Sequence, residues 1–364
     1  MRVGVPREIK NHEYRVGLTP PSVAELVAAG HSVVVETRAG AGIDFEDQDY
    51  IDVGASIVPT AAEVFAHSDM IVKVKEPQPQ EIALLESRHL LFTYLHLAAD
   101  KPQALGLMAS GATCIAYETV TAADRSLPLL KPMSEVAGRM SVQVGAHYLE
   151  KEQGGRGVLL GGVPGVAPAR VAILGGGVSG VNAAQMAVGM RADVTIYDIN
   201  NARLAELDMF FSSQIKTAYA SKAAIAAAVK NAHLVIGAVL VPGAAAPKLV
   251  TREMLKTMKR GSVLVDIAID QGGCFETSHA TTHADPVYEV DGVIHYCVAN
   301  MPGAVARTSA FALNNATLPF VLKLAGLGAE AAMASDPHLA NGLNVSGGKI
   351  RHPAVAEALD LPLN

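Results

Sequence analysis

The fold is decided by residues 171–180, which read VAILGGGVSG. Four apolar residues predict a buried strand, and the Gly-x-Gly-x-x-Gly pattern that follows opens a segment of helical composition. Gly175 permits the tight turn, Gly177 lets the backbone approach a pyrophosphate, and Gly180 allows the helix to pack closely on the strand. Asp198 follows about twenty residues later, where a carboxylate can accept a hydrogen bond from a ribose 2′-hydroxyl. This order of features predicts a dinucleotide-binding turn.

The composition bounds the class of protein. At 364 residues the chain exceeds the size at which single cores stop growing, so we expect two domains. It has 29 basic and 35 acidic side chains, a net charge of −6, and no basic stripe, which argues against binding of nucleic acid. The three cysteines, Cys114, Cys274 and Cys297, lie far apart, and their odd number favours a reducing compartment, the cytoplasm.

Neither a secretory signal nor a membrane span is expected. The N-terminal residues MRVGVPRE lack a long apolar core and a cleavage site of small residues. Residues 171–190 carry no charge and are about as long as a membrane span. Their glycines, together with Ser179, Asn182 and Gln185, favour a buried strand and turn instead.

Strand-like and helix-like runs alternate along the chain, which is the pattern of a parallel α/β sheet. We expect strands at residues 2–6, 31–36, 69–75, 90–96, 113–118, 193–198, 233–241, 261–270 and 293–298. Helices are expected from Pro20, over 134–153 and over 304–326. The prediction is an α/β fold of two doubly wound, Rossmann-like domains whose parallel sheets flank a cleft. The first is discontinuous, residues 1–128 plus 307–364, and the second covers residues 129–306.

Four polar residues stand where parallel α/β sheets bind ligands, beyond the carboxyl ends of strands. Lys75 can polarise a carbonyl group or bind a carboxylate, and Lys73 shares its strand face. His96 can act as an acid or base near neutral pH, although a hydrogen-bonded core histidine is the alternative. Arg15, in a polar loop after the first strand, can clamp a carboxylate with its planar guanidinium group.

Asp270 is the fourth candidate, because it leaves an apolar run just before Gln271-Gly272-Gly273. A carboxylate at that exit can exchange protons with a substrate. Asp266 lies inside the same run and is expected to organise the backbone or to cap a neighbouring element.

A metal site is not expected. Cys274, His279 and His283 have the spacing of possible ligands only if residues 279–283 form a helix. Thr281, Thr282 and the following Asp-Pro make that helix improbable, and no fourth ligand is evident. Motifs of common hydrolases are also missing from the sequence.

Taken together, several motifs make the chain closely resemble the L-alanine dehydrogenase family over essentially its whole length. They are RVGVPREIKN at 2–11, KVKEP at 73–77, YLHLA at 94–98, PMSE at 132–135, the turn at 175–180, DIAIDQGG at 266–273 and YCVANMP at 296–302. The same superfamily contains the nucleotide-binding part of proton-pumping transhydrogenase. The resemblance implies reversible oxidative deamination of L-alanine to pyruvate and ammonium with NAD, in a cytoplasmic homohexamer.

The resemblance also implies roles for residues. Arg15 and Lys75 of the first, substrate domain would bind the substrate, and His96 and Asp270 would be the acid/base groups that meet across the cleft. Tyr94, Leu130, Met133 and Asn300 would line the pocket. Residues expected around NAD, besides the three glycines of the turn, are Ser134, Val178, Ser179, Asp198, Arg203, Ala220, Val239, Leu240, Ile267, Ala268, Ile269, Asp270, His279, Val298, Ala299, Asn300 and Met301.

Two of these residues depart from the family pattern. Ala220 stands where relatives commonly have a serine against the adenosine half, and Ser221 can replace that serine through a small backbone shift. His279 stands where arginine is usual. Asp198 would repel a 2′-phosphate, which predicts NAD over NADP, although Arg203 lies nearby.

Two other functions compete with this one. The chain could be the nucleotide-binding component of a transhydrogenase, which passes hydride between nucleotides beside a membrane partner. It could also be a nucleotide-binding interaction module without turnover. The complete set of Arg15, Lys75, His96 and Asp270 argues against the second alternative.

Overall fold

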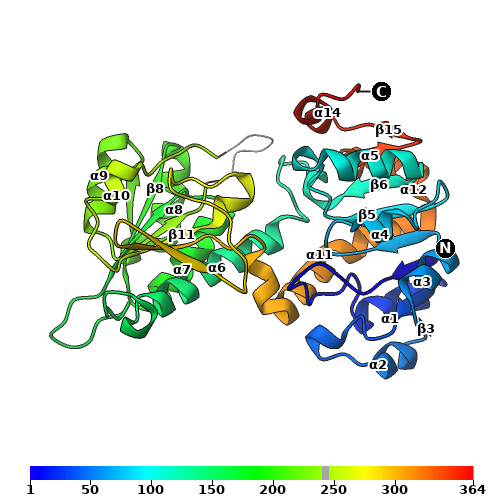
Figure 1. Cartoon of the computed structure of the whole chain (residues 1–364), viewed down its shortest axis with the longest axis horizontal. Coiled ribbons are helices and arrows are strands. Elements are labelled where there is room, and N and C mark those ends of the chain that lie inside the picture. The colour runs from blue at the N-terminus through cyan, green and yellow to red at the C-terminus, as the bar shows by residue number, and fades with distance from the viewer. Residues whose placement is uncertain (240–245, 364) are drawn as a thin grey trace. The chain divides into compact units, whose positions relative to one another are not determined.

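The computed structural model describes residues 1–239 and 246–363, so the predicted cofactor residue Leu240 lies outside the described residues. The chain divides into two compact units, Met1–Met133 with Val305–Asn364, and Ser134–Ala304. In Figure 1 the first unit runs from blue to cyan and returns in orange and red, and the second is green to yellow.

The first unit contains a mostly parallel sheet of eight strands, in the order β15-β14-β6-β5-β4-β1-β2-β3. Its strands are β1 (Arg2–Val5), β2 (Ser32–Glu36), β3 (Ser56–Val58), β4 (Met70–Val72), β5 (Leu90–Thr93), β6 (Thr113–Ala116), β14 (Leu343–Ser346) and β15 (Lys349–Ile350). Its helices are α1 (Pro20–Ala28), α2 (Asp47–Asp52), α3 (Ala61–His67), α4 (Pro79–Ile82), α5 (Lys101–Ser110), α11 (Ala306–Leu327), α12 (Ala329–Ser335), α13 (Pro337–Ala340) and α14 (Pro353–Leu359).

Local chemistry explains the ends of these elements. Pro20 occupies the first turn of α1, where its missing N–H costs nothing. The Asp100 side chain caps α5 by accepting a hydrogen bond from the Gln103 amide, which stabilises such a helix by about 1 kcal/mol. Gly111 ends the same helix in the left-handed conformation that favours glycine. The chain then enters β6, whose Cys114 and Ile115 are fully buried.

The second unit contains a sheet of seven strands, in the order β12-β13-β11-β10-β7-β8-β9. Its strands are β7 (Arg170–Leu174), β8 (Asp193–Asp198), β9 (Lys216–Tyr219), β10 (Leu234–Gly237), β11 (Val263–Asp266), β12 (Val287–Val290) and β13 (Val293–Tyr296). Its helices are α7 (Val178–Gly189), α8 (Asn201–Phe211), α9 (Lys222–Asn231) and α10 (Arg252–Leu255), and most of α6 (Lys131–Tyr148) belongs to it.

The parallel strands of each sheet reverse their order once, between β1 and β4 in the first unit and between β7 and β10 in the second. Ligands of doubly wound sheets bind beyond the carboxyl ends of the strands at this point. The predicted fold class, doubly wound and mostly parallel in both sheets, is confirmed.

Several predicted details were wrong. Three strand pairs are antiparallel, β12 with β13, β14 with β6, and β14 with β15, and none of them was expected. The strand expected over 261–270 ends at Asp266 and continues as a short 3₁₀ helix, Ile267–Gln271. The helix expected from Ser134 begins one turn earlier, at Lys131, and ends at Tyr148.

The apolar stretch at 171–190 is strand β7 followed by helix α7, as predicted. Among the described residues, a single segment, Met301–Leu327, is long and apolar enough to cross a membrane by length and composition. Its helix α11 also packs against α1 and α12 within the first unit and buries Leu313, Asn314 and Val321.

Candidate active site

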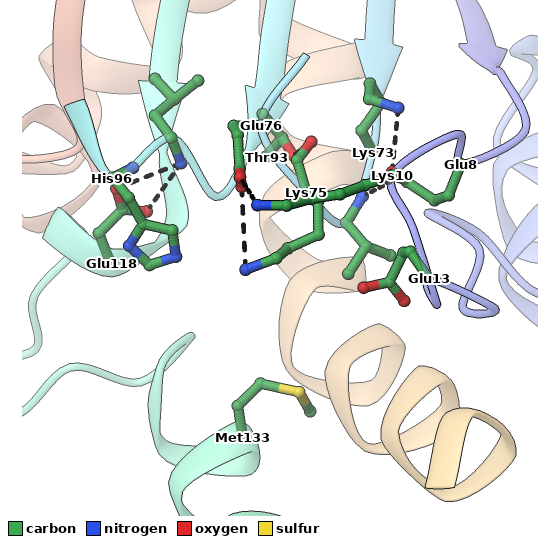
Figure 2. Close-up of polar contacts among 12 residues, drawn as sticks. Glu8, Lys10, Glu13, Lys73, Lys75, Glu76, Thr93, His96, Glu118 and Met133 are labelled. Carbon is green, nitrogen blue, oxygen red and sulfur yellow. Dashed lines mark hydrogen bonds and ion pairs between the residues drawn. The ribbon is translucent and has the colours of Figure 1, made fainter. Parts of the chain in front are cut away.

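The polar residues predicted for the first unit follow the strands on either side of its reversal point. Arg15 lies in the loop after β1, Lys75 follows β4, and His96 follows β5. These strands are mutually parallel, so their carboxyl ends form one edge of the sheet. Figure 2 shows this edge, with Lys75 and His96 on neighbouring strand ends, and also Met133 in the first turn of α6.

Arg15 is buried rather than exposed, which the sequence did not reveal. Its Nε and Nη2 donate to the two carboxylate oxygens of Glu13 at 2.7 and 2.5 Å, and its Nη1 donates to the Met133 sulfur at 3.1 Å. Burial alone lowers the pKa of Arg15, but the Glu13 carboxylate outweighs it and the pKa is raised. The guanidinium group is therefore charged and fixed in orientation.

Tyr94 joins this group to His96. The Tyr94 hydroxyl donates to the backbone oxygen of Leu129 at 2.5 Å, beside the predicted pocket residue Leu130. Its ring lies parallel to the His96 ring, with an interplanar angle of 5° and centroids 5.7 Å apart. The first unit therefore brings together five predicted residues, Arg15, Tyr94, His96, Leu130 and Met133.

His96 is held by its backbone while its ring is exposed. Its φ is +50°, a conformation that costs energy for a residue with a side chain. The Glu118 carboxylate accepts hydrogen bonds from the His96 amide at 2.6 Å and from the Leu95 amide at 3.2 Å, as Figure 2 shows. Glu118 therefore offsets the strain that presents the imidazole at the end of β5.

Lys75 and Lys73 occupy different environments. The Lys75 backbone oxygen accepts from the Thr93 hydroxyl at 2.9 Å, and its ammonium group lies 3.8 Å from Glu76. Lys73 is fully buried between Glu8 and Glu81, with its ammonium nitrogen 3.1 and 2.7 Å from their carboxylates. Lys73 is therefore a structural ion-pair partner, whereas Lys75 is partly exposed at the strand end.

Replacement of the two lysines by methionine is expected to separate these roles. Lys73→Met strands two buried carboxylates, so the free energy of unfolding should fall by about 3–5 kcal/mol. Lys75→Met removes only a partly exposed pair, worth about 1 kcal/mol or less. Denaturant unfolding of both variants measures the difference, and an equal loss of stability in both would contradict the assignment.

In the second unit, the glycines of the turn have three different surroundings. Gly175 has φ +107°, and a Cβ atom there would lie 2.7 Å from the Ala238 backbone oxygen. A Cβ atom at Gly180 would lie 1.9 Å from the Gly175 oxygen, so α7 packs too closely for any side chain. A Cβ atom at Gly177, at the N-terminus of α7, would meet no atom within 4 Å. Of these three glycines, only Gly177 therefore has open space where a side chain would lie.

Asp198 ends β8 and is fixed beside this turn. Its carboxylate accepts from the Gly176 amide at 2.7 Å and from the Asn200 amide at 2.8 Å. The neighbouring Arg203 donates to the Gly176 oxygen at 2.8 Å and pairs with Glu206 at 2.7 Å. An acidic residue therefore stands at the strand end, and the nearby arginine carries its own counter-charge.

Most of the other predicted cofactor residues of the second unit also follow strand ends of the parallel sheet. Val239 follows β10, residues 267–270 follow β11, and residues 298–301 follow β13. Asp270 is exposed on its short helix, whereas Asp266 is fully buried. The Asp266 carboxylate accepts from backbone amides on both sides of the Asp270 segment, which confirms the expected organising role.

The two departures from the family pattern have local partners. Ser221, next to Ala220, caps α9 by accepting from the Ala224 amide at 3.2 Å. The His279 ring stacks on Tyr288 with centroids 3.6 Å apart. The Ser221 hydroxyl therefore already caps a helix. That it also takes the place of a serine at position 220 stays a prediction.

The spaced cysteine and histidines have separate partners as well. His283 donates to the Asn300 backbone oxygen at 3.0 Å, and the Cys274 thiol lies 3.6 Å from Asp266. Within residues 1–239 and 246–363, no three histidine, cysteine or acidic side chains come together as metal ligands.

Sequence reasoning missed the acids that fix the site, Glu8, Glu13, Glu81 and Glu118. Glu118 alone had a signal, because it follows β6 just as His96 follows β5. Glu8 and Glu13 lie in the loop with Arg15, but pairing within a loop leaves no periodic pattern.

Comparisons with known proteins agree with this geometry. Two Rossmann-like units with a glycine-rich turn are typical of a dinucleotide-binding protein. Residues 4–137 match the N-terminal domain, and residues 141–353 the C-terminal domain, of alanine dehydrogenase/PNT. The chain belongs to the alanine dehydrogenase/PNT family and is a pyridine-nucleotide-dependent amino-acid dehydrogenase.

Individual relatives match over the full length. The alanine dehydrogenase of Halomonas elongata is 60% identical, over 99% of this chain and 97% of its own. That of Mycolicibacterium smegmatis is 57% identical, over 100% and 98%. A solved L-alanine dehydrogenase has a TM-score of 0.96 at 56% identity, over 99% of both chains. A transhydrogenase from Sinorhizobium meliloti has a TM-score of 0.83 at 28% identity, over 97% of this chain and 100% of its own.

Proposed function

We propose that this protein catalyses the reversible oxidative deamination of L-alanine to pyruvate and ammonium with NAD. The observation that carries the proposal is full-length identity of 55–60% to alanine dehydrogenases. It is supported by three groups at one edge of the first sheet: the buried, charged guanidinium group of Arg15, the partly exposed ammonium group of Lys75 and the exposed ring of His96.

The second unit is proposed as the NAD-binding domain. The open space at Gly177 and the N-terminus of α7 suit a pyrophosphate, and Asp198 suits a ribose 2′-hydroxyl. A 2′-phosphate would meet the Asp198 carboxylate, and Arg203 already pairs with Glu206. We therefore propose NAD rather than NADP, with Ser134, Val178, Ser179 and the residues after β10, β11 and β13 in contact with it.

NAD, when bound, supplies the hydride acceptor for the Cα–H of alanine. Water must then add to the resulting iminium carbon and ammonia must leave, so one group takes a proton from water and protons return to nitrogen. We propose His96 and Asp270 for these transfers, His96 from its exposed ring at the end of β5. The balance is alanine, water and NAD⁺ giving pyruvate, ammonium, NADH and a proton.

Arg15 and Lys75 are proposed to hold the substrate. The Arg15 guanidinium group, braced by Glu13, would bind the carboxylate, and Lys75 would bind the carboxylate or the carbonyl oxygen. A clamped carboxylate keeps the small substrate from rotating and so places Cα for reaction. Tyr94, Leu130, Met133 and Asn300 would exclude larger side chains, whereas discrimination against glycine rests on one methyl group, worth about 1–3 kcal/mol.

The remaining assignments are proposals of the same kind. The first unit is proposed as the substrate domain, and the protein as a cytoplasmic homohexamer that associates with neither nucleic acid nor membrane. The net charge of −6 argues against nucleic acid, and the three buried, free cysteines support an intracellular protein.

The function is tested by steady-state reduction of NAD with a panel of amino acids. We expect L-alanine to be the preferred substrate, D-alanine to be inert, and NADP to give at least 100-fold lower kcat/KM than NAD. Inertness toward every amino acid, combined with hydride transfer from NADH to a second nucleotide, would instead favour a transhydrogenase component.

A further inference from the structure

The buried carboxylate of Asp266, four residues before Asp270, accepts four hydrogen bonds. Oδ1 accepts from the Ala268 amide at 3.0 Å and lies 3.6 Å from the Cys274 thiol, which donates to it. Oδ2 accepts from the Cys274 amide at 2.9 Å and from the Ser278 hydroxyl at 2.5 Å. Asp266 is itself fully buried, so these contacts are made away from solvent.

The four donors lie on both sides of the segment that carries Asp270. Ala268 belongs to the 3₁₀ helix Ile267–Gln271, whereas Cys274 and Ser278 lie on the returning chain. The Asp266 carboxylate therefore binds the chain both where it enters and where it leaves the seven-residue loop 267–273. Asp270 is exposed on that loop, while Ala268 and Ile269 beneath it are buried.

The loop also closes tightly on this carboxylate. Gly273 has φ +76°, and a Cβ atom there would lie 2.6 Å from the Asp266 Oδ2 and 2.6 Å from the Ser278 Cβ. The Gly273 amide donates to the Ala268 oxygen at 3.0 Å, and the Gly272 amide to the Ile269 oxygen at 2.9 Å. These hydrogen bonds and the close approach to Asp266 thus fix the conformation of the loop.

A second anchor acts from outside the loop. The exposed Lys248 donates to the backbone oxygens of Gly272 and Gly273 at 2.5 and 2.8 Å. Because it is exposed, its hydrogen bonds exchange readily with water and contribute little. Loss of the Asp266 acceptor, by contrast, leaves buried amides unpaired, at about 1–3 kcal/mol each.

We propose that Asp266 is a positioning residue for Asp270: by binding both ends of loop 267–273, it fixes where the Asp270 carboxylate lies during proton transfer. The inference rests on the proposed function, in which Asp270 is an acid/base group. It assigns Asp266 no contact with substrate or cofactor.

The test is a double-mutant cycle of Asp266→Asn and Asp270→Asn in the full-length protein. In Asp266→Asn one oxygen becomes an NH₂ group, which cannot accept from Cys274 and Ser278. We expect kcat for alanine oxidation to fall 10–100-fold, because a displacement of about 1 Å can cost 10²-fold in rate. The kcat of the double variant should lie within twofold of that of Asp270→Asn alone. Once the Asp270 carboxylate has been removed, a change in its position can no longer affect the rate.

Two further variants serve as controls for misfolding and for effects that do not involve Asp266. Ser278→Ala removes a single hydrogen bond of the same carboxylate and should lower kcat three- to tenfold with little change in thermal midpoint. Lys248→Met releases the same loop from its outer side and should leave kcat within threefold of wild type.

The outcomes distinguish the proposed role of Asp270 from the proposed role of Asp266. Wild-type kcat in Asp270→Asn would overturn the proposed role of Asp270 itself. A slow Asp270→Asn beside wild-type rates in Asp266→Asn and Ser278→Ala would overturn the positioning role. Losses that multiply in the double variant would also overturn it, because they would show that Asp266 acts independently of Asp270.

Discussion

Replacing His96 with alanine is expected to lower kcat for L-alanine oxidation by about 10²–10⁴-fold, the usual contribution of an acid/base group. The imidazole is exposed at the end of β5, and its removal leaves the bonds of Glu118 to the backbone in place. The fold and the second unit should therefore be unaffected. Stopped-flow and steady-state rates measure the loss, and NADH fluorescence titration should give a Kd within twofold of wild type.

The left-handed backbone at His96 calls for a matched variant. Alanine tolerates φ +50° poorly, whereas asparagine adopts this conformation more readily and lacks a titratable ring. His96→Asn should therefore retain wild-type thermal stability and lose turnover as fully as His96→Ala. Substantial turnover in His96→Asn would show that the imidazole moves no essential proton.

Alanine at Gly177 is expected to weaken NADH binding, whereas alanine at Gly180 is expected to destabilise the fold. A Cβ atom at Gly177 meets nothing, and its φ of −71° suits any residue, so Gly177→Ala should fold normally. Its methyl group would occupy the space proposed for the pyrophosphate. We expect the Kd for NADH to rise at least tenfold, which corresponds to about 1.4 kcal/mol.

Gly180→Ala should instead damage the fold itself. Its Cβ atom would lie 1.9 Å from the Gly175 backbone oxygen, which cannot move without opening the turn. We expect a loss of stability above about 4 kcal/mol, in the range of severe core substitutions, seen as a large drop in thermal midpoint. Gly180→Ala serves as the reference for a variant that loses stability. If Gly177→Ala binds NADH with unchanged affinity, the pyrophosphate does not bind at this turn.

Strong local patterns explain why much of the fold could be predicted from sequence. The run from Val171 to Gly180 combines strand, turn and helix in ten residues, and β8 has the bounds that were expected. The antiparallel strand β15 escaped prediction because it has two residues, too few to show a period.

In the candidate site, too, some features could be predicted from the sequence and others could not. The positions of Lys75, His96 and Asp270 after strand ends were predictable, because each follows an apolar run. Burial was not predictable: Lys73 and Lys75 stand two residues apart, yet one is enclosed by carboxylates and the other is partly exposed. The pairing of Arg15 with Glu13 depends on a loop conformation that tertiary packing sets.

The most direct test of the proposed activity is the initial rate of NADH formation by purified protein with NAD and L-alanine, compared with D-alanine and other L-amino acids. The proposal predicts rapid reduction with L-alanine, a stoichiometric yield of pyruvate, and loss of both in His96→Asn and Asp270→Asn. Absence of alanine-dependent NADH formation in the wild type, with NADH binding intact, would contradict it.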